Sequence, residues 1–357
     1  MKANSAIPET QVAVVIPAYR AAAHIAGVLR GIPEFVAWII VVDDCSPDDA
    51  AAIVEEQSRR DPRIRLLRHA ENQGVGGAVL TGYAEAHRLG AEIVVKMDGD
   101  GQMDPAHLPA LIAPLLRGEA DYAKGNRYLH ARQLRAMPLP RRLGNLGLSF
   151  LTKLASGYWN IFDPTNGYTA IHASLVPLLD QEAIGRRYFF ESSMLLELSL
   201  LRAVVRDVYI PARYGDETSN LSIIKTLSQF PAALLKGFCR RVWIQYVVRD
   251  FSIASLYAIA GLALLLSGGV FGAIRWCSSA QQGVTTPTGT VMLAALPVLL
   301  GIQLLLQAVS LDIQNQPMHC LHRDAPANQE TQPTAFAPPP LPIVEQSKTR
   351  LPRQRAA

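Results

Sequence analysis

The sequence predicts an α/β domain with a mostly parallel β-sheet, followed by two membrane-spanning helices. Within the first hundred residues, four short apolar runs alternate with segments of helix length. Beyond residue 250, two uncharged apolar stretches each exceed the about 20 residues that a helix needs to cross a bilayer. The 357 residues carry a net charge of only +4 and four isolated cysteines. This composition argues against a disulfide scaffold and gives only weak grounds for nucleic-acid binding.

The expected strands are apolar along their whole length, which is typical of a parallel sheet covered by helices on both faces. We expect strands at residues 12–16, 38–42, 64–67 and 93–97. The intervening helices are expected at residues 21–30, 48–60 and 77–89. Ligands of such sheets bind outside the carboxyl ends of the strands, so the loops after the strands are the expected position of a site.

Polar residues follow the first two expected strands. The loop after the first strand begins with Pro17, Ala18 and Tyr19. Directly after the second strand come Asp43 and Asp44, whose carboxylates can accept hydrogen bonds from a base edge or a ribose hydroxyl. Capping of the next helix is an alternative role for acids in this loop, and it suits residues 46–48 better than the adjacent pair.

Two more acids follow the fourth expected strand. Asp98 and Asp100 are two residues apart, so in an extended segment their side chains point to the same side. Converging carboxylates suit Mg²⁺ or Mn²⁺, which also bind phosphate oxygens. An EF-hand is excluded, because Met103 and Pro109 stand where its Gly and Glu belong. A turn capped by Asp104 is the alternative that needs no metal.

Four motifs in this order resemble those of family 2 glycosyltransferases. They are IPAY at residues 16–19, VDDCSPD at 42–48, NQG at 72–74 and MDGDGQ at 97–102. The resemblance covers about residues 10–220 and implies a GT-A fold, a Rossmann-like domain that uses a nucleotide-diphospho-sugar donor, Mg²⁺ or Mn²⁺, and inversion at the anomeric carbon. The donor would contact Pro17, Ala18, Tyr19, Asp43, Asp44 and Asp98. The metal would be held by Asp98 and Asp100.

Three later motifs are similar to those of dolichol-phosphate mannosyltransferases and bacterial polyprenyl-phosphate relatives. They are KGNRY at residues 124–128, DPTNGY at 163–168 and RYGDETS at 213–219. This resemblance implies transfer of a hexose to undecaprenyl or dolichyl phosphate. Asn126 and Asn166 stand where Ser is common in that family, and Asn220 where Lys is frequent, so the identity of the sugar stays open.

The resemblance also implies roles for single residues. Arg127 matches a phosphate-binding arginine, and Glu191 lies where many members have an acidic catalytic residue. The expected catalytic residues are Asp100, Arg127 and Glu191. A lipid phosphate is already anionic, so it calls for positive charge more than for a general base. The basic candidates are Arg132, Arg135, Arg141, Arg142 and Arg213, and the residues assigned to the acceptor phosphate are Arg141, Arg142, Arg213 and Ser219.

The second half of the chain is predicted to meet the membrane. Residues 221–249 have an apolar stripe at helical spacing with a basic border, and Pro231 is expected to divide them into two interface helices. The spans are expected at residues 251–274 and 290–311, and the flanking basic residues predict a cytoplasmic α/β domain and C-terminus. The predicted units are the catalytic domain at 10–220, a mobile acceptor loop within it at 129–142, interface helices at 221–249, two transmembrane helices at 250–313 and a disordered Pro-rich tail at 314–357.

Three other functions fit the sequence less well than transfer to a polyprenyl phosphate. A membrane-anchored transferase acting on a sugar hydroxyl is the main alternative, and it would need a general base. A processive polysaccharide synthase is disfavoured, because the Arg275-Trp276 pair lies between the expected spans and Gly272 replaces the required Gln. An inactive membrane adaptor is disfavoured by the intact acids and arginine of the motifs. The expected partners are a nucleotide-diphospho-sugar, a polyprenyl phosphate and the lipid bilayer, without nucleic acid, and a homo-oligomer is left open.

Overall fold

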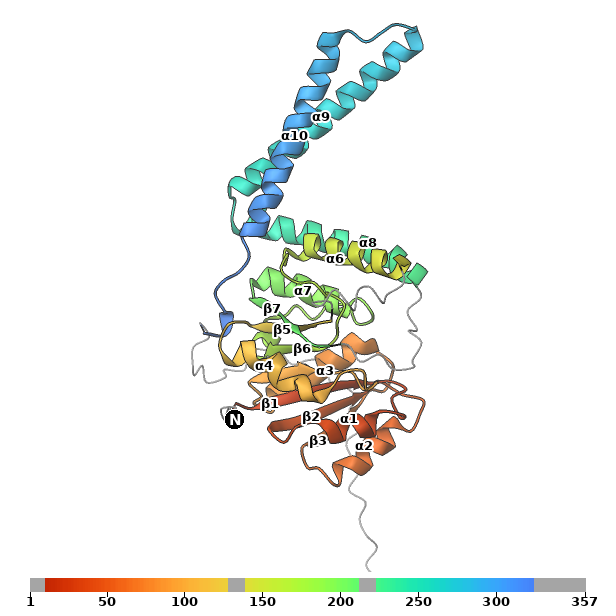
Figure 1. Ribbon diagram of the computed structural model, residues 1–357, viewed down its shortest axis with the longest axis vertical. Coiled ribbons are helices and arrows are strands. Elements are labelled where there is room, and N and C mark those ends of the chain that lie inside the picture. The colour runs from red at the N-terminus through yellow and green to blue at the C-terminus, as the bar shows by residue number, and fades with distance from the viewer. Residues whose placement is uncertain (1–9, 128–138, 212–222, 324–357) are drawn as a thin grey trace, which may run out of the picture.

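A seven-stranded sheet lies at the centre of the α/β domain (Figure 1). The computed structural model describes residues 10–127, 139–211 and 223–323. The strands are β1 (Val12–Ala18), β2 (Val36–Asp43), β3 (Ile64–Arg68), β4 (Ile93–Lys96), β5 (Tyr122–Asn126), β6 (Thr169–His172) and β7 (Val205–Tyr209), in the order β3-β2-β1-β4-β6-β5-β7. All pairings are parallel except those of β6, which runs antiparallel to β4 and β5. The four strands and the mostly parallel sheet expected from the sequence are confirmed.

Helices cover both faces of this sheet, which is why the strands are apolar throughout. One face packs against α1 (Ile25–Gly31), α2 (Ala50–Ser58) and α4 (Leu108–Leu116). The other packs against α3 (Gly74–Arg88) and α7 (Phe190–Leu201). Side chains of β1 alternate between the two cores: Val14 belongs to the first, Val15 to the second, and both are fully buried.

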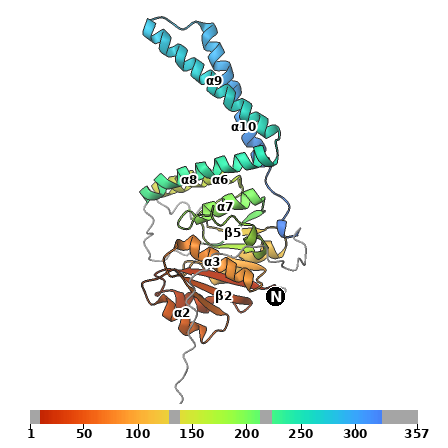
Figure 2. The ribbon, with the colours of Figure 1, turned by 180° about the vertical axis from the view of Figure 1, so that it is seen from behind.

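Two long helices, α6 (Leu139–Ser156) and α8 (Ile223–Trp243), lie side by side over the end of the domain that carries α7 (Figures 1 and 2). The helix α8 continues through Pro231, so the predicted division there is wrong. A proline inside a helix costs about 3 kcal/mol, and the burial of Phe230 and Leu234 against α7 and its preceding loop offsets that cost. The predicted acceptor loop is also shorter than expected, because α6 begins at Leu139, and its remaining part lies outside the described residues.

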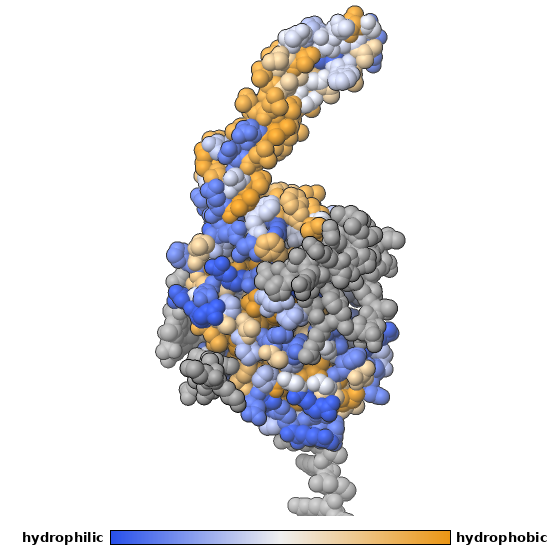
Figure 3. All heavy atoms as spheres, in the orientation of Figure 1, coloured by the Kyte–Doolittle hydropathy of each residue, from blue (hydrophilic) through white to orange (hydrophobic). Residues whose placement is uncertain are grey.

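The hairpin of α9 (Ile253–Gln282) and α10 (Thr288–Gln314) projects away from the domain (Figures 1 and 2). Both helices are long and apolar enough to cross a membrane, and their surface is mostly hydrophobic (Figure 3). They cross closely at Gly261 and Gly301: a Cβ at Gly301 would lie 2.7 Å from the Gly261 carbonyl oxygen. Arg275 and Cys277 belong to α9 and not, as predicted, to the connecting loop, since the helix continues to Gln282.

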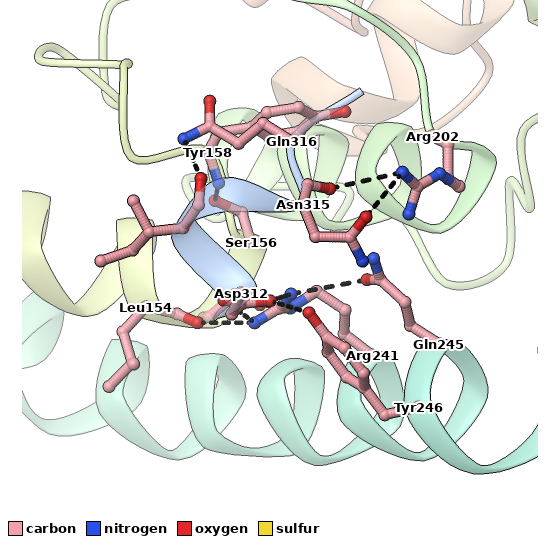
Figure 4. A network of polar contacts seen from close by, with 12 residues as sticks. Leu154, Ser156, Tyr158, Arg202, Arg241, Gln245, Tyr246, Asp312, Asn315 and Gln316 are labelled. Carbon is pink, nitrogen blue, oxygen red and sulfur yellow. Dashed lines mark hydrogen bonds and ion pairs between the residues drawn. The ribbon is translucent and has the colours of Figure 1, made fainter. Parts of the chain in front are cut away.

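A buried ionic network, the junction, joins the hairpin to the α/β domain (Figure 4). Arg241 of α8 is 2% exposed and binds both carboxylate oxygens of Asp312, at 2.7 and 3.1 Å. Its other contacts are to the last carbonyls of α6, with Nε 2.8 Å from Ala155 O and Nη2 3.1 Å from Leu154 O. Tyr246 donates its hydroxyl to Asp312 at 2.5 Å. Arg241 therefore fixes α6, α8 and α10 together.

The chain beyond α10 returns to the α/β domain, so the predicted disorder from residue 314 is wrong for residues 314–323. The carboxylate of Asp121, which is fully buried, accepts backbone hydrogen bonds from Val204 at 2.8 Å, Leu321 at 3.0 Å and His322 at 3.1 Å. A buried carboxylate needs such donors, and here the returning segment supplies two of them. The rest of the predicted tail lies outside the described residues.

Candidate active site

The carboxyl ends of β1, β2 and β4 bring three of the predicted loops together. Ala18 is paired with Asp43 across β1 and β2, and its carbonyl accepts the backbone N–H of Asp44 at 2.9 Å. Met97, which begins the third loop, donates its backbone N–H to Val15 of β1 at 3.0 Å. The residues predicted to contact the donor therefore lie along one edge of the sheet. Pro17 and Ala18 belong to the end of β1 and not, as predicted, to the loop after it; Pro17 is half-buried and Ala18 is buried. Tyr19 follows the strand and is exposed.

The adjacent acids after β2 have different surroundings. Asp44 Oδ1 accepts hydrogen bonds from His69 Nδ1 at 2.7 Å and from the Gln73 N–H at 2.8 Å. Its Oδ2 accepts the N–H of Gly74, which has a φ of +84° and begins α3, at 2.8 Å. Burial alone would raise the pKa of Asp44, but these hydrogen bonds hold it below its ordinary value. The Asp44 carboxylate is thus occupied in holding the start of α3.

Asp43 has an unsatisfied oxygen. Its Oδ1 is buried and has no hydrogen-bond partner within the described parts of the chain. Burial raises the pKa of Asp43, because too few donors compensate for the loss of water. A buried polar atom without a partner is uncommon in folded proteins and is a candidate for ligand contact. Of the two adjacent acids, Asp43 is the one with remaining capacity to accept a hydrogen bond.

A buried lysine connects two of the predicted site residues. Lys96, the last residue of β4, is 1% exposed, and its Nζ lies 2.9 Å from Asp98 Oδ1 and 3.0 Å from Glu191 Oε1. Glu191 is in the first turn of α7. Burial alone would lower the pKa of Lys96, but the two carboxylates raise it above its ordinary value. No role was predicted for Lys96 from the sequence, although it is the single charged residue in the apolar run 93–97, and a charge in a buried strand indicates a functional or paired residue.

The acids after β4 lie beside a glycine of the later motif at residues 163–168. A Cβ at Gly167 would lie 2.8 Å from Asp98 Oδ2, so only glycine allows the backbone to come so close to that carboxylate. Asp100 Oδ1 accepts the Gln102 N–H at 3.0 Å in the turn that follows. Carboxylate oxygens of this kind are the ligands that Mg²⁺ and Mn²⁺ prefer, and the Asp98 side chain is 30% exposed, so it remains accessible to a ligand.

Arg127 is oriented by an internal carboxylate. Its Nε lies 2.7 Å from Asp163 Oδ2 and its Nη2 3.1 Å from Asp163 Oδ1, which is a bidentate arrangement. Asp163 is fully buried, whereas the Arg127 side chain is 34% exposed. The pairing joins the KGNRY and DPTNGY motifs, and it holds the guanidinium at the domain surface.

A second buried lysine, Lys124, begins the KGNRY motif, but the sequence alone assigned it no role of its own. Lys124 of β5 is 0% exposed, and both it and Lys96 are register partners of Thr169 in β6, so the two lysines project from the same face of the sheet. Lys124 donates a hydrogen bond to the Asn166 carbonyl. Burial lowers the pKa of Lys124 to about 8.

The predicted acceptor residues are only partly described. Arg141 and Arg142 lie in the first turn of α6, and their side chains lie outside the described part of the structure. Arg132, Arg135, Arg213 and Ser219 lie outside the described residues.

Comparison with known proteins identifies relatives of this chain. The profile described as Glycosyl transferase family 2 matches residues 13–177. A UDP-N-acetylglucosamine–dolichyl-phosphate N-acetylglucosaminyltransferase of Methanococcus voltae is 33% identical over 188 residues, 49% of this chain and 74% of that protein. A polyprenol monophosphomannose synthase of Mycolicibacterium smegmatis is 30% identical over 190 residues, 52% of this chain and 70% of that protein. An undecaprenyl-phosphate mannosyltransferase of Micrococcus luteus is 28% identical over 173 residues, 48% and 70% of the two chains.

Among solved structures, glucosyl-3-phosphoglycerate synthase of Mycobacterium tuberculosis is similar with a TM-score of 0.48 and 21% identity, over 65% of this chain and 80% of that one. The sequence relatives confirm the family inferred from the motifs. The chain is a glycosyltransferase with a GT-A-like α/β domain, and it belongs to glycosyltransferase family 2.

Proposed function

We propose that the chain transfers a hexose from a nucleotide-diphospho-sugar to a membrane polyprenyl phosphate, with inversion and with the help of Mg²⁺ or Mn²⁺. The three relatives above are named for dolichyl phosphate, undecaprenyl phosphate or polyprenol as acceptor. The observation that carries the proposal is the exposed apolar surface of α6 and α8, which are fixed to the hairpin through Arg241. It contains Leu146, Phe150, Leu235 and Trp243, each more than half exposed. Such a surface suits contact with the lipid in which a polyprenyl phosphate resides.

The donor is proposed to bind along the carboxyl ends of β1, β2 and β4. Asp43 Oδ1 would accept a hydrogen bond from the base or the ribose, which would satisfy its missing partner. Asp44 would shape this pocket indirectly, since its oxygens already hold the start of α3. Arg127, oriented by Asp163, would bind phosphate oxygens.

Asp98 and Asp100 would hold the divalent metal, which when bound would neutralise charge on the departing nucleoside diphosphate. The bond between the anomeric carbon and the diphosphate oxygen breaks, and its electron pair leaves with the diphosphate. A phosphate oxygen of the acceptor forms the new bond from the opposite face of the sugar, which inverts the configuration.

Glu191 is proposed to orient the reacting groups without removing a proton. An acceptor phosphate oxygen is already anionic, so its attack needs positioning and charge compensation more than a base. Glu191 Oε1 is ion-paired with Lys96, which agrees with an orienting role. Arg141, Arg142, Arg213 and Ser219 stay the predicted contacts of the acceptor phosphate.

Product analysis tests this proposal directly. The purified protein in lipid is incubated with a panel of nucleotide sugars, with Mn²⁺ or Mg²⁺, and with undecaprenyl or dolichyl phosphate, and the lipids are analysed by mass. A glycosylated polyprenyl phosphate is expected. Faster transfer to a lipid-linked sugar hydroxyl than to polyprenyl phosphate would instead favour the hydroxyl-directed transferase.

We also propose that the α/β domain faces the cytoplasm. Both ends of the hairpin lie on the side of this domain (Figure 1), and Cys277 lies near its far end. Cys45 and Cys277 are both exposed in the structure, so a membrane-impermeant thiol reagent can report on their sides. In intact cells, Cys277 should be labelled and Cys45 spared. The reverse pattern would contradict this orientation.

A further inference from the structure

We propose that Lys96 is a positioning residue, whose ammonium group holds Asp98 and Glu191 in one fixed arrangement. The inference rests on the proposed function and names a residue that the reaction needs beyond the motif residues. A lysine that is 1% exposed in a strand must be compensated by partners, because an unpaired buried charge is very costly. Among the described residues, the charged partners of its Nζ are two residues of the candidate site, Asp98 and Glu191.

The two carboxylates depend on Lys96 for their proximity. Asp98 belongs to the loop after β4, and Glu191 to the first turn of α7, far along the chain. Because both bind the same Nζ at 2.9 and 3.0 Å, they lie within the about 4–6 Å over which like charges repel. Removal of the ammonium would therefore leave two anions side by side, and α7 would no longer be tied to the loop.

The arrangement determines which oxygen atoms remain available. Oδ1 of Asp98, which faces Lys96, is buried, whereas the Asp98 side chain as a whole is 30% exposed, which leaves Oδ2 as the oxygen that a ligand can reach. On another side, the ring of Phe190 lies 6.0 Å from Lys96 Nζ and is 1% exposed, which closes that direction to water. We infer that Lys96 presents Asp98 Oδ2 to the ligand and keeps Glu191 beside it.

Replacement by methionine tests the role, because Met has a similar length and no charge. In Lys96→Met, kcat should fall about 100-fold while the KM for the donor changes less than about threefold, which is typical when positioning and not binding is lost. Lys124→Met is the matched control, since Lys124 is equally buried on the same face of the sheet but has no ion pair with Asp98. Its kcat should fall less than about tenfold.

Metal binding provides a readout that does not depend on turnover. The affinity for Mn²⁺ alone, measured by electron paramagnetic resonance, should fall in Lys96→Met, because Asp98 keeps its charge but loses the group that fixes its orientation. In Asp98→Asn the same affinity should fall further, at least about tenfold, because an anionic ligand is lost. Mn²⁺ binding in a folded Lys96→Met that is as tight as in the wild type, or tighter, would overturn the proposal.

A double-mutant cycle separates this role from a general loss of packing. If Lys96 acts through Glu191, then Lys96→Met combined with Glu191→Gln should be no slower than the slower single variant, within about threefold. If the decrease in kcat of the double variant equals the product of the decreases in the two single variants, the proposal is overturned. Should Lys96→Met fail to fold, a cycle of Asp98→Asn with Glu191→Gln takes its place, and independent effects there would overturn it equally. Each cycle uses the acceptor that the wild-type protein accepts, so a hydroxyl acceptor would contradict the proposed function and still allow this test.

Discussion

The buried ionic network of the junction and that of the candidate active site differ in how completely they are satisfied. In the junction, each guanidinium nitrogen of Arg241 has an acceptor, and Asp312 binds it with both oxygens. At the site, one ammonium group of Lys96 serves two carboxylates, and nearby Asp43 Oδ1 has no partner among the described residues. A network in which every donor and acceptor has a partner (a saturated network) stabilises the fold. A network that contains an acceptor without a partner (an unsaturated network) can still bind a ligand.

The largest effect should come from removing a charge at the unsaturated site. Asp100→Asn should reduce transfer at least about 100-fold, because it replaces an anionic ligand of a hard cation by a neutral amide of the same shape. The thermal midpoint should change little. Asp104→Asn is the matched control in the same loop, where Asp104 caps the short helix of residues 105–107, and it should keep most activity. Full activity of Asp100→Asn, or of the wild type in excess EDTA, would contradict the metal assignment.

The saturated junction should respond in the opposite way. Asp312→Ala leaves the guanidinium of Arg241 buried without its carboxylate, which should cost about 3–5 kcal/mol of unfolding free energy and lower the thermal midpoint measured in detergent. Mn²⁺ binding at the distant site should be unchanged. The control is Glu119→Ala, which removes an exposed ion pair with Arg117 at the surface of the domain. Equal loss of stability in both variants would show that the junction is no stronger than a surface contact.

The acids after β2 allow the same comparison between adjacent residues. Asp43→Asn should weaken binding of a nucleoside diphosphate by about tenfold, since one ligand hydrogen bond is worth about 1 kcal/mol or more, and should leave stability almost unchanged. Asp44→Asn should instead lower the thermal midpoint, because hydrogen bonds from Gln73, Gly74 and His69 depend on its charge. Isothermal titration and thermal unfolding measure the two effects. Weaker nucleoside diphosphate binding in Asp44→Asn, together with a lower thermal midpoint in Asp43→Asn, would show that Asp44 contacts the donor.

The loops at the carboxyl ends of the strands could be predicted from the sequence better than the buried contacts beneath them. The loops after β1, β2 and β4 could be predicted to meet, because parallel strands direct their carboxyl ends to the same side. Lys96 could not be assigned a partner, since Glu191 reaches it only after α7 packs on the sheet. The unsatisfied oxygen of Asp43 was equally hidden, because residue type says nothing about which of two adjacent acids is occupied.

The junction was missed for a related reason. Arg240 and Arg241 were expected to border the lipid, but both pair with acids: Arg240 with Asp180 and Glu197, and Arg241 with Asp312. Helical periodicity predicts which residues face away from the apolar stripe, not which of them meet a carboxylate from another helix. The packing of residues 315–323 was hidden too, since it depends on the buried acceptors of Asp121.

The two buried lysines should respond differently to pH. The pKa of Lys124 is lowered to about 8 in the folded protein, against an ordinary value of 10.5. Between these values the unfolded chain holds a proton that the folded chain has released, so the contribution of Lys124 to the unfolding free energy rises with pH.

From pH 7.5 to 10.5, the wild type should therefore gain about 3 kcal/mol relative to Lys124→Met, which lacks this titration. Lys96 provides the contrast, because its carboxylates raise its pKa above the ordinary value and it stays charged over this range. The difference between wild type and Lys96→Met should thus stay nearly constant with pH. Denaturant unfolding in detergent at several pH values measures both differences. If the unfolding free energies of wild type and Lys124→Met change in parallel with pH, Lys124 is charged in the folded protein. It would then contact water or an acidic partner, and the buried site would contain one more compensated charge.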